Sequence, residues 1–193
     1  MLYYRTIYPE TLELLIEIQS RKIFKDLRLV GGTALALQID HRISNDLDLF
    51  GSLKADHISI TKELNQIGKI NILNKTENIN VFSINGIKVD IVNYPYSWLS
   101  NAIKDDRIKL ADINDIAAMK LAAITGRGTK KDFIDLFFLL KEFSLEEMLD
   151  FYEQKYPDGS IFLVLKSLVY FDDDDQNLPS KMFIKNSWAS IKE

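Results

Sequence analysis

Apolar and polar residues alternate in two different ways along this chain, and the change occurs near residue 95. Before it, short apolar runs broken by glycine and asparagine are interspersed with segments of helical spacing, a pattern typical of a sheet covered by helices. Beyond Tyr94-Pro95-Tyr96, apolar residues recur at helical spacing only. We therefore predict an α+β (α/β) fold, with a sheet-containing lobe over residues 1–95 and an all-helical lobe over residues 96–193.

The periodicity also gives an approximate position for each element. In the first lobe it predicts helices over residues 11–27, 33–38 and 56–67 and strands over residues 27–30, 46–50, 70–73, 78–84 and 87–92. The dipeptide Asn85-Gly86 separates the last two strands and is typical of a two-residue type I′ hairpin. In the second lobe it predicts helices over residues 112–124, 130–143, 145–156 and 160–170, and another after residue 180. Asp112 and Asp115 have the spacing of a capping box at the start of the first of these.

Two consecutive glycines, Gly31 and Gly32, end the first predicted strand and precede a helix that begins at Thr33. Glycine permits a sharp turn and lets a ligand approach the backbone closely. A helix N-terminus beside such a turn attracts anions, because its first backbone N–H groups have no partners within the helix. We interpret this corner as a candidate phosphate-binding site.

Three aspartates lie on predicted strands that are otherwise largely apolar. Asp46 and Asp48 are two residues apart, so the pleat of a strand points both carboxylates to one face. Asp90 lies on the second arm of the hairpin and reaches the other two if that arm pairs beside them. Asp-Leu-Asp alone is common on protein surfaces, but charges on a central strand are costly unless they are paired or bind a metal. Because carboxylate oxygens suit Mg²⁺, the three aspartates are candidate metal ligands.

A second group of charges lies in the predicted helical lobe. Lys120 interrupts an apolar helix rich in small residues, where it must either extend to water or meet an anion. Lys131, Asp132 and Asp135 have spacings of three and four residues, which places them on one face of the next helix. The alternative is a set of exposed ion pairs that contribute little energy. Residues 101–131 hold seven Lys or Arg and four Asp, a locally basic stretch that suits nucleotide phosphates or RNA.

The composition excludes several other kinds of site. The chain has no cysteine and only two histidines, which excludes thiolate chemistry and histidine-rich metal sites. Its net charge of -4 argues against a protein that coats nucleic acid non-specifically. No apolar run has the length of a membrane span and the N-terminus lacks the pattern of a signal peptide, so we expect a cytoplasmic protein. We interpret the four aspartates at residues 172–175 as a solvated loop.

Five blocks of residues, in chain order across roughly residues 27–140, resemble the AbiEii/AbiGii-type nucleotidyltransferase toxins. The blocks are Gly31-Gly32-Thr33-Ala34-Leu35-Ala36-Leu37, Arg42-x-Ser44-x-Asp46-Leu47-Asp48-Leu49-Phe50, Asp90 in its apolar strand, Lys120-Leu121-x-Ala123 with Arg127, and Lys131-Asp132-x-x-Asp135-Leu136. The resemblance implies a polymerase β-like nucleotidyltransferase lobe with a mixed sheet, followed by the helical lobe. It also implies Mg²⁺-dependent transfer of nucleotides from an NTP to RNA, the 3′ end of tRNA being the expected acceptor. The further implied partner is a cognate antitoxin, in a toxin–antitoxin or phage-defence system.

The resemblance leads to a hypothesis about the role of each residue. Asp46, Asp48 and Asp90 would hold two Mg²⁺ ions, with Mn²⁺ as an alternative metal, and Asp90 would also assist deprotonation of the acceptor. Lys120 would contact the triphosphate, and Asp135 would hold Lys120 in position by charge pairing. The candidate nucleotide-binding residues are Gly31, Gly32, Thr33, Arg42, Ser44, Lys120, Arg127 and Lys131.

The glycine turn and the carboxylate pair are farther apart than in the common Gly-Ser motif of polymerase β-like enzymes. Ser44 rather than Thr33 is therefore the expected phosphate-contacting hydroxyl. The same site also suits other functions: a small-molecule nucleotidyltransferase of the antibiotic-modifying type, a kinase-like toxin that modifies a protein, or a catalytically silent nucleotide-binding module. The acceptor that retains a labelled nucleotide separates these alternatives.

Overall fold

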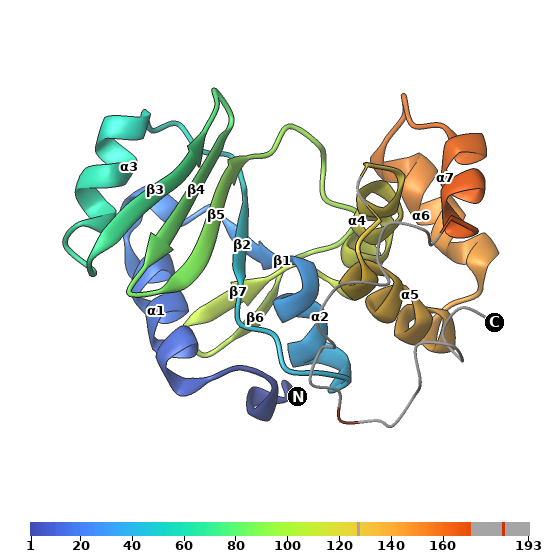
Figure 1. Ribbon diagram of the computed structural model, residues 1–193, viewed down its shortest axis with the longest axis horizontal. Helices are drawn as coiled ribbons and strands as arrows, with labels where there is room; N and C mark the ends of the chain where they lie inside the picture. The colour runs from blue at the N-terminus through green and yellow to red at the C-terminus, as the bar shows by residue number, and fades with distance from the viewer. Residues whose placement is uncertain (127, 171–182, 184–193) are drawn as a thin grey trace.

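A mixed sheet of seven strands forms the centre of the fold (Figure 1). The computed structural model describes residues 1–126, 128–170 and 183 of the chain. The strands are β1 (Arg28–Val30), β2 (Leu47–Gly51), β3 (Ile70–Lys75), β4 (Ile79–Ile84), β5 (Ile87–Asn93), β6 (Ile103–Asp105) and β7 (Ile108–Leu110). Their order across the sheet is β3-β4-β5-β2-β1-β7-β6. β2 pairs with β5 and β1 with β7 in parallel, and the other neighbours are antiparallel. The predicted α+β fold class is confirmed.

The helices lie on both sides of this sheet. They are α1 (Pro9–Ser20), α2 (Gly31–Ile39), α3 (His57–Leu64), α4 (Ile113–Gly126), α5 (Lys130–Glu142), α6 (Leu145–Lys155) and α7 (Ile161–Leu168). In Figure 1, α1 and α3 lie on one side of the strands and α4 to α7 lie on the other. α2 contacts β1 and β2 and also α4 and α5, so it connects the sheet to the helical layer.

The strand pattern places two kinds of side chain on opposite faces of the sheet centre. Leu47 and Leu49 of β2 are fully buried, and they pair in register with Val89 and Ile91 of β5, which are also fully buried. Alternation then turns Asp48 to the opposite face, toward the helical layer. The hydrophobic core thereby determines which way the carboxylate points.

The predicted hairpin between β4 and β5 is confirmed. Ile84 pairs with Ile87, so the loop contains two residues, Asn85 and Gly86, at φ values of 50° and 87°. Both values lie in the left-handed region that a type I′ turn requires, and asparagine and glycine adopt that region at the least cost.

The first predicted helix is too long. α1 ends at Ser20, because Arg21 adopts an extended conformation (φ −75°, ψ 132°), and a short 3₁₀ turn follows over Lys22–Phe24. Phe24 and Leu27 are both fully buried although neither is in α1. Their apolar spacing correctly predicted that both residues are buried, but the predicted extension of the helix to residue 27 is wrong.

The prediction that the chain is entirely helical after residue 96 is also wrong. β6 and β7 form a hairpin that extends the sheet beyond β1. Each strand has only three residues, which is too short for alternation to stand out from helical spacing. The turn between them contains Asp106 at φ 49°, a conformation that aspartate tolerates better than most residues. Residues 96–112 therefore contribute to the sheet, and the division into two lobes at residue 95 stays a prediction.

Asp115 does not have its predicted capping role. Asp112 accepts a hydrogen bond from the backbone N–H of Asn114 (3.1 Å), as expected of a residue preceding a helix. The fully buried carboxylate of Asp115 instead pairs with Lys155 Nζ at 2.6 Å, and Lys155 also donates to the carbonyl of Ser97 (3.0 Å). This contact ties α4 and α6 to the segment that leaves the sheet.

Three earlier predictions fall outside the described residues: the placement of Arg127, the loop over residues 172–175 and the helix after residue 180. Over the part of the chain that is described, every helix is too short or too polar to cross a bilayer.

Candidate active site

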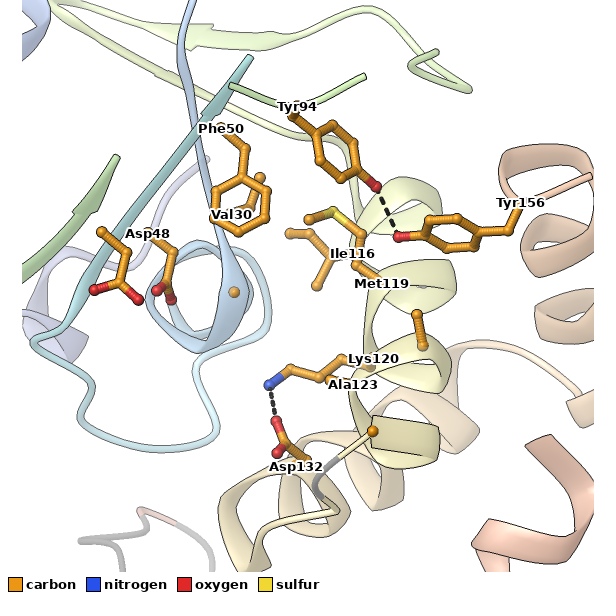
Figure 2. Close-up of a pocket in the computed structure, with 14 residues that line it drawn as sticks. Val30, Asp48, Phe50, Tyr94, Ile116, Met119, Lys120, Ala123, Asp132 and Tyr156 are labelled. Atoms are coloured by element: carbon orange, nitrogen blue, oxygen red, sulfur yellow. Dashed lines mark hydrogen bonds and ion pairs between the residues drawn. The ribbon is translucent and has the colours of Figure 1, made fainter. Parts of the chain in front are cut away.

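Two of the three predicted carboxylates meet at the centre of the sheet. β2 and β5 run parallel, and Asp48 is the register partner of Asp90. Both side chains line a cavity of about 440 Å³ between the sheet and α4, which Figure 2 shows in close-up. The predicted approach of Asp90 to Asp48 therefore agrees with the strand register. The sequence around each aspartate does not show which strands pair.

Asp48 has an unusual electrostatic environment. Burial, and next the negative charge of Asp90, raise the pKa of its carboxyl from the ordinary 3.8 to about 6. Gly31 lies directly in front of it, at φ +68°, and a β-carbon at that position would overlap Asp48 Oδ2. The absence of a side chain at Gly31 thus keeps the carboxylate open to the cavity.

Asp90 has one satisfied and one unsatisfied oxygen. Lys88 Nζ donates to Asp90 Oδ2 at 2.8 Å. Asp90 Oδ1 is buried and has no hydrogen-bond partner among the described residues. A buried carboxylate oxygen without a donor is costly, and a cation or a hydroxyl donor at this position would remove the cost.

Lys120 reaches the cavity from α4, on the side facing the sheet (Figure 2). Its Nζ lies 2.9 Å from Asp132 Oδ1 and 2.7 Å from Asp135 Oδ2, and the residue is only 6% exposed. Burial alone would lower the pKa of this amine, but the charges of Asp135 and Asp132 outweigh it and raise the pKa. Lys120 is therefore a fixed positive charge opposite the two carboxylates.

Asp135 organises the base of this arrangement. Its fully buried carboxylate accepts hydrogen bonds from Arg42 Nε (2.7 Å) and Arg42 Nη2 (3.0 Å), lies 2.7 Å from His41 Nε2, and pairs with Lys120. Burial opposes ionisation, yet Lys120 and Arg42 hold the pKa of Asp135 well below its ordinary value. The geometry suits the predicted positioning role of Asp135, which stays a prediction.

Asp132 is a residue that the role assignment omitted. Besides its contact with Lys120, its Oδ2 accepts hydrogen bonds from Thr129 Oγ1 (2.7 Å) and from the Thr129 backbone N–H (3.2 Å). The second bond completes a capping box at the start of α5. The sequence places Asp132 in the same block as Asp135, but it does not show the contact between Asp132 and Lys120.

Four of the predicted nucleotide-binding residues do not line the cavity: Gly32, Thr33, Arg42 and Ser44. Arg42 is 3% exposed, and its guanidinium donates to Asp135. Glycine is required at position 32 because a β-carbon there would overlap that guanidinium. Thr33 Oγ1 lies 2.9 Å from Ser44 Oγ and donates to the backbone carbonyl of Asp46 (2.5 Å). The Thr33 hydroxyl thereby contacts the residue that precedes β2, the strand that carries Asp48.

Asp46 and Lys131 lie at the exposed edge of the site. Asp46 precedes β2, half of its side chain is exposed, and Lys131 Nζ is 3.9 Å from its Oδ2. Among residues 1–126, 128–170 and 183, no three His, Cys, Asp or Glu side chains are grouped closely enough to hold an ion as they stand. The three-carboxylate metal set therefore stays a prediction, of which the structure brings together Asp48 and Asp90.

An aromatic group closes the other end of the cavity. Phe50 and Tyr94 are 5.3 Å apart between ring centroids, and the hydroxyls of Tyr94 and Tyr156 lie 2.7 Å from each other. Burial raises the pKa of Tyr156 to about 12 and also raises the pKa of Tyr94, so both phenols stay protonated. The sequence signalled this end only through the clustering of tyrosines around Pro95.

Comparison with known proteins agrees with this architecture. The family model described as "Nucleotidyl transferase AbiEii toxin, Type IV TA system" matches residues 13–186. The chain is 33% identical over 195 residues to an uncharacterized protein, aq_aa25, of Aquifex aeolicus (strain VF5), an alignment that covers 98% of this chain and 94% of that protein.

Two solved structures have a similar fold. JHP933 from Helicobacter pylori aligns with a TM-score of 0.51 at 20% identity, over 88% of this chain and 82% of that one. MenT4, nucleotidyltransferase toxin Rv2826c from Mycobacterium tuberculosis H37Rv, aligns with a TM-score of 0.56 at 15% identity, over 83% of this chain and 69% of that one. At these identities the likeness concerns the fold alone. The family match confirms the resemblance found in the sequence: the chain belongs to the AbiEii nucleotidyl transferase toxin family and is a nucleotidyltransferase.

Proposed function

We propose that this nucleotidyltransferase moves nucleotides from an NTP to an RNA acceptor in a Mg²⁺-dependent reaction, and that it acts as the toxin of a toxin–antitoxin pair. The observation that carries the proposal is the pairing of Asp48 with Asp90 on one wall of a 440 Å³ cavity, with Lys120 on the other wall. Two acids facing a fixed lysine suit a triphosphate that is bound together with divalent cations.

The residues present fit a divalent cation. Asp48 and Asp90 are register partners, the buried Asp90 Oδ1 lacks a donor among the described residues, and Gly31 leaves the front of Asp48 open. Carboxylate oxygens are the ligands that Mg²⁺ prefers. Asp48 and Asp90 would hold the ion, with Asp46 as the third candidate ligand. A bound Mg²⁺ would neutralise phosphate charge and lower the pKa of the attacking hydroxyl.

The chain's own residues then supply position and charge. Lys120, held by Asp132 and Asp135, offers a rigid ammonium to the triphosphate without paying the entropy of ordering a long side chain. Asp90 would also accept the proton of the acceptor hydroxyl, as the oxygen of that hydroxyl bonds to the α-phosphorus and pyrophosphate leaves. The loss of water from a cavity walled by the sheet and α4 strengthens each of these contacts.

The acceptor and the partner are inferred from the family. The resemblance implies RNA, and the 3′ end of tRNA in particular, as the acceptor. The locally basic stretch over residues 101–131 in an otherwise acidic chain supports an RNA acceptor. The family description names type IV toxin–antitoxin systems, which supports a cognate antitoxin as the partner.

A labelling experiment tests the proposal. The purified protein is incubated with Mg²⁺ and each NTP in turn, labelled at the α-phosphate or, in a parallel reaction, at the γ-phosphate, together with total tRNA, an aminoglycoside or a bulk protein fraction. We expect label on tRNA, and a rate at least 100-fold lower in Asp48→Asn, because the pair of acids is then broken. Asp150→Asn, an exposed change on α6, is the matched control and should keep the wild-type rate.

The outcomes separate the alternatives. The α-label on the aminoglycoside or on protein would replace RNA as the acceptor while retaining the catalytic assignment, whereas transfer of only the γ-label to protein would identify a kinase-like toxin. Incorporation by Asp48→Asn at the wild-type rate would refute the role of the acid pair. Binding of NTP without transfer to any acceptor would identify a silent nucleotide-binding module.

A further inference from the structure

The cavity has a polar end and an apolar end, and both walls change character in the same direction. On β2, Asp48 is followed two residues later by Phe50, which faces the same side of the sheet. On α4, Lys120 is preceded one turn earlier by Ile116. Two residues along a strand and one turn of helix both span about 5 to 7 Å. One such step on either wall therefore leads from the charged groups to the apolar groups.

The apolar end is shaped for a flat ring. Phe50 contributes one aromatic surface, Ile116 and Met119 contribute the facing aliphatic surface from α4, and Tyr94 and Tyr156 close the space between them (Figure 2). The rings of Phe50 and Tyr94 are tilted by 50°, so neither covers the face of the other completely. Aromatic and aliphatic side chains around such a space are typical of the walls between which nucleobases stack.

The polar groups at this end are two phenols bonded to each other. One of the two O–H groups donates the 2.7 Å hydrogen bond between Tyr94 and Tyr156. The second O–H and the remaining oxygen lone pairs have no other hydrogen bond to the described residues. The edge of a nucleobase is a fixed pattern of donors and acceptors, so one free donor beside free acceptors can favour one base over another.

The position of the pair is fixed from the sheet and from the helical layer. Tyr94 directly follows β5, and Tyr156 directly follows α6. The neighbouring Lys155 is buried, with its Nζ 2.6 Å from Asp115 Oδ1 and above the ring of Tyr94 at 5.2 Å. This anchoring holds the end of α6, and with it the Tyr156 hydroxyl, against the segment after β5.

We propose that Phe50, Tyr94 and Tyr156 form the base-binding end of the nucleotide site, and that the paired hydroxyls of Tyr94 and Tyr156 select which NTP is used. The inference rests on the proposed function, because it places the triphosphate between the acids and Lys120. It adds the residues that discriminate among bases, which neither the sequence pattern nor the family match assigns.

Binding of all four bases tests the proposal. Calorimetry with Mg²⁺ measures the affinity of the α,β-methylene analogues of ATP, GTP, CTP and UTP, and of inorganic triphosphate, for the wild type, Tyr94→Phe and Tyr156→Phe. We expect the wild type to prefer one base, and the affinity ratio between the best and worst analogue to fall by about fivefold or more in at least one variant, the effect of one neutral hydrogen bond. The affinity for inorganic triphosphate should stay unchanged.

Tyr96→Phe is the matched control. Its ring packs edge-on against Tyr156 at 4.7 Å, yet Tyr96 is exposed and is not among the described residues that line the cavity. The same base preference in the wild type and in both cavity variants would overturn the inference, as would equal wild-type affinity for all four bases. An equal fall in affinity for nucleotides and for inorganic triphosphate would also overturn it, because the pair would then only set the spacing between the sheet and the helical layer.

Failure of the proposed function has a different signature. If the wild type binds neither the analogues nor inorganic triphosphate, the triphosphate site itself is wrong, and the base-binding end is refuted with it. If the wild type binds inorganic triphosphate and all bases equally, the triphosphate site stands and only the discrimination by tyrosines is refuted.

Discussion

Replacement of Asp48 by asparagine should stabilise the folded protein while it removes activity. The pKa of Asp48 is raised from 3.8 to about 6 by burial and by Asp90, so its ionised form is disfavoured in the folded state. A shift of this size corresponds to up to about 3 kcal/mol, at 1.36 kcal/mol for each unit of pKa. Asp48 is partly exposed to the cavity, and solvent screening reduces the effect to about 2 kcal/mol.

The pH dependence has a definite sign. Because the folded pKa lies above the unfolded one, the folded state binds more protons between pH 3.8 and about 6, and the wild type loses stability as pH rises through this range. Asparagine does not titrate. The free energy of unfolding of Asp48→Asn, minus that of the wild type, should therefore increase by about 2 kcal/mol between pH 4 and pH 7 and then level off.

Urea unfolding followed by circular dichroism, in buffers with chelator at several pH values, measures this difference. Carboxylates far from Asp48 titrate alike in the two proteins and cancel in the subtraction. The exposed Asp150→Asn serves as the control and should show a difference that does not change with pH. A difference for Asp48→Asn that is flat between pH 4 and pH 7, or that decreases, would refute the account of this site. Added Mg²⁺ should stabilise the wild type more than the variant, since a ligand that binds only the folded state raises its stability.

Three further predictions concern the groups around Asp48. Lys120→Met should keep the fold, because Asp135 retains Arg42 and His41 as partners. Calorimetry should show at least a tenfold weaker affinity for inorganic triphosphate, and an unchanged affinity would remove Lys120 from the site. Gly31→Ala should lower the rate of nucleotide transfer at least tenfold, because the new methyl group overlaps Asp48. It should also lower the free energy of unfolding in urea by about 1 kcal/mol, because φ is +68°. Full activity would show that this corner has room for a methyl group. Asp135→Asn should lower the free energy of unfolding by about 3 kcal/mol, because Arg42 and Lys120 lose their shared buried partner; a loss below about 1 kcal/mol would show that other groups compensate.

The local patterns were predictable because their causes are local. Asn85-Gly86 determines a tight turn through its own backbone preferences, and the alternation of polar and apolar residues determines which face of β2 carries Asp48. The meeting of Asp48 with Asp90 needed one long-range assumption, that the hairpin arm pairs beside β2, and the parallel register satisfies it.

The remaining features depend on contacts between residues far apart in the chain. Arg42 was expected at the phosphate, but Asp135, 93 positions later, accepts hydrogen bonds from its Nε and Nη2. The spacing of Asp135 on its own helix gave no sign of this partner. In the same way, the base-binding proposal depends on Tyr94 and Tyr156, which are 62 positions apart and belong to different periodic segments.

The alternating burial along β2 also limits how this enzyme can change during evolution. Sliding β2 by one position along β5 would point Leu47 and Leu49 into the cavity and place Asp48 in the hydrophobic core. Such a protein would lose its folded state as well as its activity. Selection for a stable interior therefore protects the spacing of the acids even when the enzyme is not in use, whereas changes of loop length between β2 and β5 leave that spacing intact.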